Sequence, residues 1–346
     1  MLALISITLA NRKNARAYSI AGHSQQRIAS LRDIPFDAAF HFRFLSVEDI
    51  LLICSCLEVP SEVITANGDK APGWEAFAML LMKLSYPTRL LTMNVTFGRS
   101  IGAMSGLIST LTSILHDRWK THVNVLNTDA VAPKLAVFRE AVHSKGGNPL
   151  LNVWGFIDGT LRPCARPTRG QQTIFNGKDK QHGLKYQGIM TPDGIFRMVL
   201  GPFAGRKHDS RMLRESGLLQ QLESDNRFVR EDGTAYQLYG DPAYPVSRYL
   251  KRPYKGARLT AGQQAFNSQM SRVRECVEWG FGNILNLWQS LELVRYEKFF
   301  ESAIARRYQL AAILTNVYTC MYPERNNVAQ FFEVQPPSLQ EYLSTL

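Results

Sequence analysis

The sequence predicts an α/β protein in which a mixed sheet flanked by helices follows a mostly helical N-terminal region. Three observations predict this class. Between residues 149 and 322 the apolar patterns follow the order strand, strand, strand, helix, strand, helix. Residues 41 to about 120 carry helical periodicity instead. Finally, 45% of the 346 residues are hydrophobic, which is enough to fill a sizeable core over two domains.

The first 40 residues are expected to form a flexible basic arm. No acidic residue precedes Asp33, whereas five cations do or lie beside it: Arg12, Lys13, Arg16, Arg27 and Arg32. The apolar first ten residues look like a signal core but lack a preceding basic region, so secretion is not expected. An organelle presequence stays open as an alternative, because it would also be basic and free of acids.

Residues 41–148 are expected to form a helical domain whose last two helices are joined by Gly98-Arg99-Ser100. Two helices with a tight glycine turn are typical of a helix-turn-helix and equally of a plain helical bundle, and both interpretations stay open. The segment 101–115 contains no Arg or Lys, which counts against base reading there. The expected helices begin after Ser46, run from Pro72 to Ser85, and cover residues 88–97 and 101–119.

Residues 149–322 are expected to form the sheet domain. Pro192-Asp193-Gly194 predicts a hairpin turn, so the second and third strands are antiparallel. Asp209 is expected to cap a helix that runs through Leu222. A helix from Tyr296 to Tyr322 closes the domain, and residues 323–346 form a C-terminal tail with a short docking helix. The expected strands cover residues 153–157, 184–190, 195–201 and 237–241.

Asp241 lies at the carboxyl end of the fourth expected strand. The apolar run from Gln237 is stopped by Pro242, whose ring cannot donate to a sheet ladder. Ligand crevices of open α/β sheets form at this edge. The alternative, on composition alone, is a turn aspartate that stabilises Pro242-Ala243.

A long helix is expected to begin after Thr260 and to present Glu278. Thr260 and Gln263 together form a capping box. Apolar residues from Phe266 to Ile284 recur at spacings of three and four, so one stripe faces the core and Glu278 lies on its flank. Arg274 is one turn earlier on the same flank, so a simple helical ion pair is the alternative.

Asp158 ends the first expected strand, and with Asp241 and Glu278 it makes a set of three carboxylates, here called the acid triad. Hard divalent cations prefer oxygen ligands. Carboxylates crowded together repel one another and their pKa values rise, and metal binding relieves that repulsion. The pattern therefore predicts a divalent-metal site, with Mg²⁺ or Mn²⁺ as the cofactor.

The charge balance favours a polyanionic partner. Forty Lys and Arg against 29 Asp and Glu leave a formal charge of +11, and the pI is about 9.5. Charge alone does not separate nucleic acid from an anionic membrane surface, but no apolar run is long enough to span a bilayer. Five cysteines without a C-x-x-C pair predict neither a disulfide framework nor a zinc site, and favour a reducing compartment.

Two basic stretches flank the expected site and suit phosphate neutralisation, with Tyr249 and Tyr254 available for stacking on a frayed DNA end. Solvated loops are the alternative. The first stretch holds Arg162, Arg166, Arg169, Lys178, Lys180 and Lys185, and the second holds Arg248, Lys251, Arg252, Lys255 and Arg258.

Five motifs stand in a fixed order between residues 150 and 320. They are Gly155 to Thr160, Gly205 to Ser210, Tyr239 to Pro245, Phe266-Asn267, and Arg274 to Gly282. In this order they resemble the DDE-superfamily endonuclease domain of PIF/Harbinger transposases. The family often continues with Lys and Arg after the glutamate, whereas this chain has Ile284-Leu285-Asn286, which puts a DNA contact there in doubt.

The resemblance implies a ribonuclease H-like fold in which the fourth strand lies beside the first. It implies that the acid triad is catalytic and holds two divalent ions, with Asp158 bridging both, Asp241 on one and Glu278 on the other. His208, Asp209 and Arg274 are candidates for supporting roles: His208 on the scissile phosphate or a water, and Asp209 as a fourth ligand or, preferably, only the helix cap.

The expected function is that of a metal-dependent DNA endonuclease that cleaves transposon ends and transfers strands. DNA, a Myb-like helper protein and further copies of the chain on DNA are the expected partners, and the nucleus is the expected location. The alternative is a domesticated, non-catalytic DNA-binding or scaffold protein on the same fold. A ribonuclease H-like enzyme acting on RNA is a third interpretation, which the resemblance disfavours.

Overall fold

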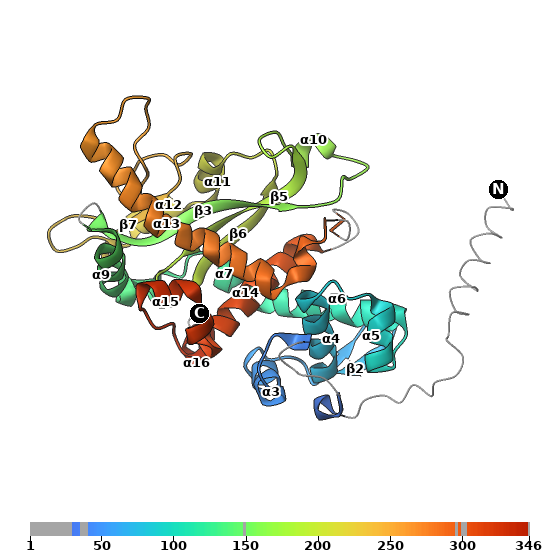
Figure 1. Cartoon of the computed structure of the whole chain (residues 1–346). Coiled ribbons are helices and arrows are strands. Elements are labelled where there is room, and N and C mark those ends of the chain that lie inside the picture. The colour runs from blue at the N-terminus through green and yellow to red at the C-terminus, as the bar shows by residue number, and fades with distance from the viewer. Residues whose placement is uncertain (1–29, 35–40, 148–149, 295–296, 299–302, 345–346) are drawn as a thin grey trace.

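The computed structural model describes residues 30–34, 41–147, 150–294, 297–298 and 303–344. Its centre is a six-stranded mixed sheet flanked by helices, as the sequence predicts (Figure 1). The sheet runs in the order β4-β5-β3-β7-β8, and β6 also pairs with β5. The strands are β3 (Val153–Pro163), β4 (Phe175–Asn176), β5 (Gln181–Met190), β6 (Phe196–Ala204), β7 (Gln237–Gly240) and β8 (Leu250–Lys251).

The central strand β3 has neighbours of both directions. It pairs antiparallel with β5 and parallel with β7. The hairpin between β5 and β6 is confirmed: Gly194 has a φ of 75°, and Asp193 Oδ1 accepts from the Thr191 hydroxyl at 2.6 Å. The strand β3 extends beyond the predicted 153–157, because its pairing with β5 continues to Pro163 opposite Gly183.

Two layers of helices cover the sheet, and alternate residues of β3 face them. Phe156 belongs to the hydrophobic cluster that includes buried residues of α13 (Ala261–Leu287) and α14 (Ile304–Met321). Ile157 belongs to the cluster that includes buried residues of α11 (Asp209–Ser216) and α12 (Leu218–Ser224). The helix predicted from Asp209 to Leu222 is therefore two helices, because Gly217 between them is left-handed with a φ of 66°.

The long helix α13 begins as predicted. The Thr260 side chain accepts from the Gln263 N–H, and the Gln263 side chain accepts from the Thr260 N–H, which completes the capping box. Met270, Val273, Val277, Phe281 and Ile284 of the predicted stripe are buried. The next α-helix, α14, begins at Ile304 rather than at the predicted Tyr296: residues 297–298 and 303 are not helical, and positions 296 and 299–302 lie outside the described residues.

The N-terminal region is mostly helical and packs directly on the sheet layer (Figure 1). The buried side chains of α3 to α6 share one hydrophobic cluster with α13 and α14, whereas Leu126, Val131, Leu135 and Phe138 belong to the cluster of α11 and α12. The short hairpin of β1 and β2 is a feature that the sequence patterns did not predict. The elements are α3 (Val47–Cys56), β1 (Glu62–Ile64), β2 (Lys70–Pro72), α4 (Gly73–Ser85), α5 (Leu90–Phe97), α6 (Ile101–Trp119), α7 (Thr121–Asn124), α8 (Thr128–Val131) and α9 (Leu135–Gly146).

The two helices of the predicted helix-turn-helix are present as α5 and α6, joined through left-handed Gly98. Helix α6 packs against both α4 and α14. Its exposed positions include Gly102, Ser105 and Ser109, and none of the exposed side chains along α6 up to residue 115 is cationic. This geometry favours a packing role for α6, and DNA reading by it stays a prediction.

Both chain ends pack on the body where the structure describes them. Leu31 and Ile34 are buried beside the short 3-10 turn Leu31–Asp33, whereas the rest of the predicted arm and any presequence fall outside the described residues. The predicted tail contains α15 (Asn327–Phe332) and α16 (Leu339–Ser344). The Phe332 ring stacks on Phe156 at 5.9 Å, so this segment belongs to the core rather than to a tail.

The length and hydropathy of the helices decide whether any of them could span a membrane. Within the part of the chain that the structure describes, no helix combines the length and the apolar character needed to cross a bilayer.

Candidate active site

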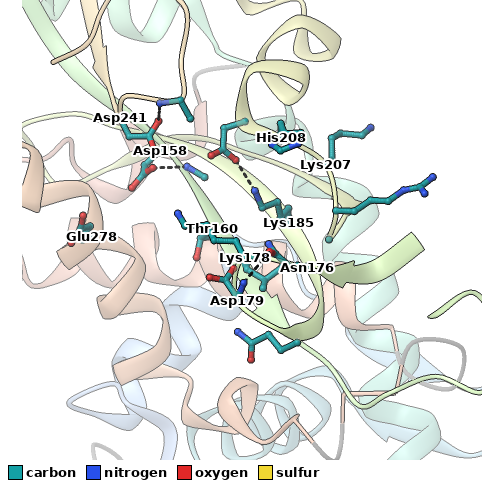
Figure 2. Close-up of a pocket in the computed structure, with 18 of the residues that line it drawn as sticks. Asp158, Thr160, Asn176, Lys178, Asp179, Lys185, Lys207, His208, Asp241 and Glu278 are labelled. Atoms are coloured by element: carbon teal, nitrogen blue, oxygen red, sulfur yellow. Dashed lines mark hydrogen bonds and ion pairs between the residues drawn. The ribbon is translucent and has the colours of Figure 1, made fainter. Parts of the chain in front are cut away.

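The register of β3 and β7 brings Asp158 and Asp241 to the same edge of the sheet. Ile157 is the partner of Gly240, so the next residue of each strand is an aspartate at the carboxyl end of the parallel pair. Figure 2 shows the two carboxylates next to each other. Both line a cleft of about 760 Å³, which Glu278 reaches from α13. The predicted position of Asp241 at the strand's carboxyl edge is confirmed.

The Asp158 side chain is 15% exposed, far less than that of Glu278 at 53%. Its Oδ1 accepts from the Gly159 N–H at 2.8 Å, and its Oδ2 accepts from Arg274 Nη1 at 3.3 Å. Burial raises the pKa of Asp158 to about 6; Arg274 and the Gly159 N–H oppose the shift, and the charges of Asp241 and Asp209 add to it. Carboxylates therefore crowd this end of the cleft.

Asp241 combines the two roles that the sequence left open. Its Oδ1 accepts from the Ala243 N–H at 2.9 Å, so it does stabilise the turn after β7. The turn hydrogen bond occupies one lone pair, and the carboxylate still lines the cleft.

The Glu278 carboxylate forms an ion pair with Arg274. Its side chain is 53% exposed, and its Oε1 accepts from Arg274 Nη2 at 2.6 Å. Arg274 thus bridges Asp158 and Glu278, so the helical ion pair considered from the sequence is present. Among the described residues, no group of three or more His, Cys, Asp or Glu side chains is arranged to hold a metal ion.

The donor chemistry at this end nevertheless fits a divalent cation. Asp158 and Asp241 offer carboxylate oxygens on adjacent strands, which are the ligands that hard cations take. The raised pKa of Asp158 reports a negative charge that its surroundings stabilise poorly, and a cation there would relieve that cost. Glu278 can join the two aspartates only if it separates from Arg274.

Asp209 does not cap α11, so the preferred prediction for this residue is wrong. The N-cap position is His208, no side chain makes a capping hydrogen bond, and Asp209 is the first helical residue. Its Oδ1 instead accepts from Lys185 Nζ at 2.9 Å. A Cβ on Gly159 would lie 2.7 Å from Asp209 Oδ1, so the glycine lets this carboxylate lie over β3. Asp209 and exposed His208 both line the cleft.

The first basic stretch is divided between the cleft, the surface and the interior. Lys178 and Lys185 line the cleft, whereas Arg166, Arg169 and Lys180 are exposed outside its lining. Arg162 was predicted to contact DNA, but it packs inward: its guanidinium lies 5.6 Å from the Tyr308 ring and donates to Thr160 Oγ1 at 2.7 Å. The alternation of β3 points position 162 at α14, which explains the difference.

In the second basic stretch, the two arginines nearest to Asp241 bond backbone carbonyls, and Arg252 supports the turn after Asp241. Arg252 donates to the carbonyls of Pro242 and Tyr244, and Arg248 donates to the Gly233 carbonyl. Lys251 is half-buried, and burial lowers its pKa. Lys255 and Arg258 are exposed.

The stacking prediction separates the two tyrosines. Tyr249 is buried at 4% exposure, so its ring cannot stack on DNA bases. Tyr254 is 49% exposed and makes an edge contact with the Phe266 ring. Of the two rings, only that of Tyr254 therefore remains available to a base.

Several polar cleft residues were not selected from the sequence. Arg206 and Lys207 belong to the Gly205 to Ser210 motif, and their charge beside His208 was a signal that could have found them. Thr160 likewise ends the Gly155 to Thr160 motif, whereas Asn176 and Gln181 carry no such signal, because only the pairing of β4 with β5, and of β5 with β3, brings them to the cleft.

A mixed sheet that carries two aspartates on neighbouring strands, facing a glutamate from a later helix, is typical of transposase-type nuclease domains. Comparison with known families agrees: residues 157–316 match the family described as DDE superfamily endonuclease. This match supports a transposase-derived DDE nuclease domain in this part of the chain.

Two relatives extend the comparison. The chain is 30% identical over 122 residues to a Microchaete diplosiphon protein described as "Probable transposase for insertion sequence element IS702", covering 35% of this chain and 42% of the relative. It is 22% identical over 260 residues to an Arabidopsis thaliana protein described as "Protein ALP1-like", covering 70% of this chain and 61% of the relative. The chain thus spans less than two thirds of either relative. No solved structure gave a significant match.

Proposed function

We propose that the protein is a metal-dependent DNA endonuclease of the transposase type, which cleaves phosphodiester bonds and transfers DNA strands. One observation carries the proposal. The parallel register of β3 and β7 puts Asp158 and Asp241 at one sheet edge, in a cleft that also receives Glu278, within the domain that matches the DDE superfamily endonuclease family.

The strand order supports a ribonuclease H-like fold. Three long strands come first in the domain: β3, β5 and β6. Each pairs antiparallel with the next. The later strand β7 returns to lie parallel to β3 on its other side, and β8 follows. This order is the one that the resemblance to the transposase family implies, with the fourth main strand beside the first.

DDE superfamily endonucleases generally use divalent metals, and the acid triad would hold Mg²⁺ or Mn²⁺ here, two ions in all. Such ions activate the attacking oxygen and stabilise the leaving one in phosphodiester cleavage. The triad would supply the oxygen ligands, with Asp158 between the two ions. For this, Glu278 and Asp158 would both have to separate from Arg274, which holds them in the structure.

The remaining cleft residues suit binding and orientation of DNA. Arg274, once released from Glu278, lies beside the acids and can neutralise a phosphate oxygen. Lys185 is held in place by Asp209, which sets the position of its ammonium over β3. His208 is exposed in the cleft and can donate to a phosphate or to a water.

The test is nicking of supercoiled plasmid in Mn²⁺. Wild type is compared with Asp158→Asn, Asp241→Asn and Glu278→Gln, and the matched control is Glu275→Gln, an exposed acid of the same helix outside the cleft lining. We expect activity in wild type and control, and none in the three triad variants. Cleavage retained in all three would show that other acids, or a contaminant, perform the reaction.

A second candidate function is that of a domesticated, non-catalytic DNA-binding or scaffold protein. The observation that favours it is Arg274, which occupies the space between Asp158 and Glu278 and holds both. This candidate expects DNA binding without metal-dependent cleavage, and no Mn²⁺ binding that depends on the triad. Electron paramagnetic resonance of Mn²⁺ titrated into wild type and Asp158→Asn separates the two candidates.

The cellular setting follows from the resemblance alone. It supports DNA in the nucleus as the substrate, a homo-oligomer assembled on that DNA, and a Myb-like helper protein. Size-exclusion chromatography with light scattering, with and without DNA, tests the assembly; a monomer under both conditions would contradict it.

A further inference from the structure

The cleft is lined by two chemically different groups of side chains. One is the acid triad, and the other comprises Lys178, Arg206, Lys207 and His208. In Figure 2, Lys207 and His208 lie on the side of the cleft away from Glu278, and Lys178 lies near Asn176 below them. The ion pair of Lys185 and Asp209 also lines the cleft. We call the second group the basic end.

Two backbone features build the basic end. Asn176 is buried, and its Oδ1 accepts from the N–H groups of Lys178 and Asp179 at 2.9 and 3.1 Å, which holds the loop between β4 and β5 in a defined turn. Gly205 is also buried: a Cβ there would lie 2.3 Å from the Ile174 carbonyl oxygen and 2.5 Å from that of Gly183. Only glycine lets the residue after β6 approach Ile174 and Gly183, which lie on the two sides of this loop, so closely.

The close approach brings cations from distant segments together. Within the described part of the chain, the Lys178 ammonium and the Arg206 guanidinium have neither a carboxylate nor a hydrogen-bond partner. Lys207 is different, because it forms an ion pair with Glu215. Asp179 also lines the cleft, but it does not pair with either free cation. The basic end therefore presents two unneutralised charges to whatever enters the cleft.

The size of the cleft restricts its ligand. A volume of about 760 Å³ lies in the range of sites that enclose ligands of small-molecule size. That space holds about one or two nucleotides of an unpaired strand. A duplex is too wide to enter it, because its major groove alone is about 12 Å wide.

We infer that the basic end is a second phosphate subsite, in which Lys178 and Arg206 bind a phosphate of the same unpaired DNA strand whose scissile phosphate lies at the acid triad. The inference rests on the proposed function and deepens it. It implies that the protein recognises DNA ends that are frayed or single-stranded, because only an unpaired strand can extend along the cleft from one end to the other.

The test compares two fluorescent DNA molecules: a blunt duplex and the same duplex with a short unpaired extension, made with either polarity. Binding is followed by fluorescence anisotropy in EDTA, so it does not depend on cleavage. Wild type is compared with Lys178→Ala/Arg206→Ala. The matched control, Arg89→Ala/Arg214→Ala, also removes two exposed cations, neither of which lines the cleft.

We expect wild type and control to bind the extended duplex about tenfold more tightly than the blunt one, a difference that should be absent in Lys178→Ala/Arg206→Ala. For the extended duplex, the salt dependence of binding should also weaken in this variant, by about 0.7 in the logarithmic slope for each phosphate that the protein no longer neutralises. Both variants should melt at the same temperature as wild type, because all four side chains are exposed.

Three results would overturn the inference: no preference of wild type for the extended duplex, an equal reduction of that preference in the control, or an unchanged preference in the cleft variant. Failure of the proposed function is a separate outcome. It would appear as absent metal-dependent nicking in a protein that still prefers the extended duplex.

Discussion

Two arginine–glutamate pairs of this protein have the same shortest distance and different surroundings. In the helical region, Arg99 Nε lies 2.6 Å from Glu75 Oε1, and in the cleft Arg274 Nη2 lies 2.6 Å from Glu278 Oε1. The first side chains are 6% and 2% exposed, the second 26% and 53%. Distance alone therefore does not reveal what an ion pair does.

In the buried pair, both carboxylate oxygens of Glu75 accept hydrogen bonds from Arg99. Arg99 Nη2 donates to Glu75 Oε2 at 2.7 Å, so the contact is bidentate, and Nη1 donates to the Lys70 carbonyl at 2.7 Å. These bonds tie the turn between α5 and α6 to α4 and β2. In the cleft pair the contact is not bidentate, because Arg274 donates from one nitrogen to Glu278 and from the other to Asp158. The first arrangement is typical of a structural contact, and the second can exchange one partner for another.

The largest effect is expected from breaking the buried pair. Arg99→Ala leaves Glu75 as an unpaired buried charge, which costs about 3–5 kcal/mol of the free energy of unfolding. Urea denaturation measures this destabilisation. If the variant does not fold, Arg99→Met/Glu75→Leu keeps the test open, since replacement of both charges by apolar groups should recover most of the stability. A destabilisation no greater than that of a surface variant would contradict the comparison.

The next largest effect concerns Asp158, which shares Arg274 with Glu278. Its pKa of about 6 in the fold exceeds the ordinary 3.8, so the folded state binds more protons between these values and stability falls as the pH rises from 4 to 6. At neutral pH the buried charge costs at most about 3 kcal/mol. Asp158→Asn cannot ionise, so we expect it to unfold at higher urea than wild type at pH 7.5 in EDTA.

The same experiment repeated from pH 4 to pH 8 checks the sign. In wild type the contribution of Asp158 is fully present below pH 4 and is lost as the pH rises through 6, whereas in Asp158→Asn this decline should be absent. An identical pH profile in both proteins would show that the carboxylate is already charged at no cost.

A smaller effect is expected from Arg274→Gln. Because Glu278 is more than half exposed, the pair contributes only a few tenths of a kcal/mol to stability. Removal of the cation frees Glu278 and leaves Asp158 without its counter-charge, so Mn²⁺ should bind about fivefold more tightly, or about 1 kcal/mol. Isothermal titration calorimetry measures the change, with Arg272→Gln as the control; weaker binding in Arg274→Gln would assign the arginine a role in holding the metal ligands in place.

The smallest effect provides the reference for both pairs. Arg211 and Glu215 form an ion pair at 2.9 Å on the surface of α11, with side chains 63% and 36% exposed. Arg211→Ala should leave the melting temperature unchanged within error, because water solvates both groups equally well when they are apart. A shift as large as that of Arg99→Ala would remove the distinction between buried and exposed pairs.

The features that sequence patterns predicted correctly are local ones. The capping box of Thr260 and Gln263 needs residues three apart, and the turn at Asp193-Gly194 needs adjacent ones. Asp241 follows the strand β7 directly, so its place at the sheet edge also depends on neighbours in the chain. The order of strands and helices follows in the same way from apolar periodicity.

Apart from the helix divided at Gly217, the main predictions that needed correction concern partners from distant segments. Asp209 was expected to cap its own helix but binds Lys185 of β5, and Arg162 was expected at the surface but packs on Tyr308 of α14. The residues after 322 were expected to form a tail but pack under the sheet through Phe332. In each case the residue type is compatible with both the predicted and the observed position, and the neighbouring residues in the sequence do not decide between them.

By itself, the sequence determined the elements of this protein, the acids that end them, and its excess of basic charge, because backbone conformation follows from short-range sterics, capping and periodicity. Only the tertiary structure decided that Arg274, beyond its helical partner Glu278, also holds Asp158, and that Lys178 and Arg206 share one cleft. Those facts depend on strand register and helix packing, which bring together side chains that are far apart along the chain and whose pairing no local pattern encodes.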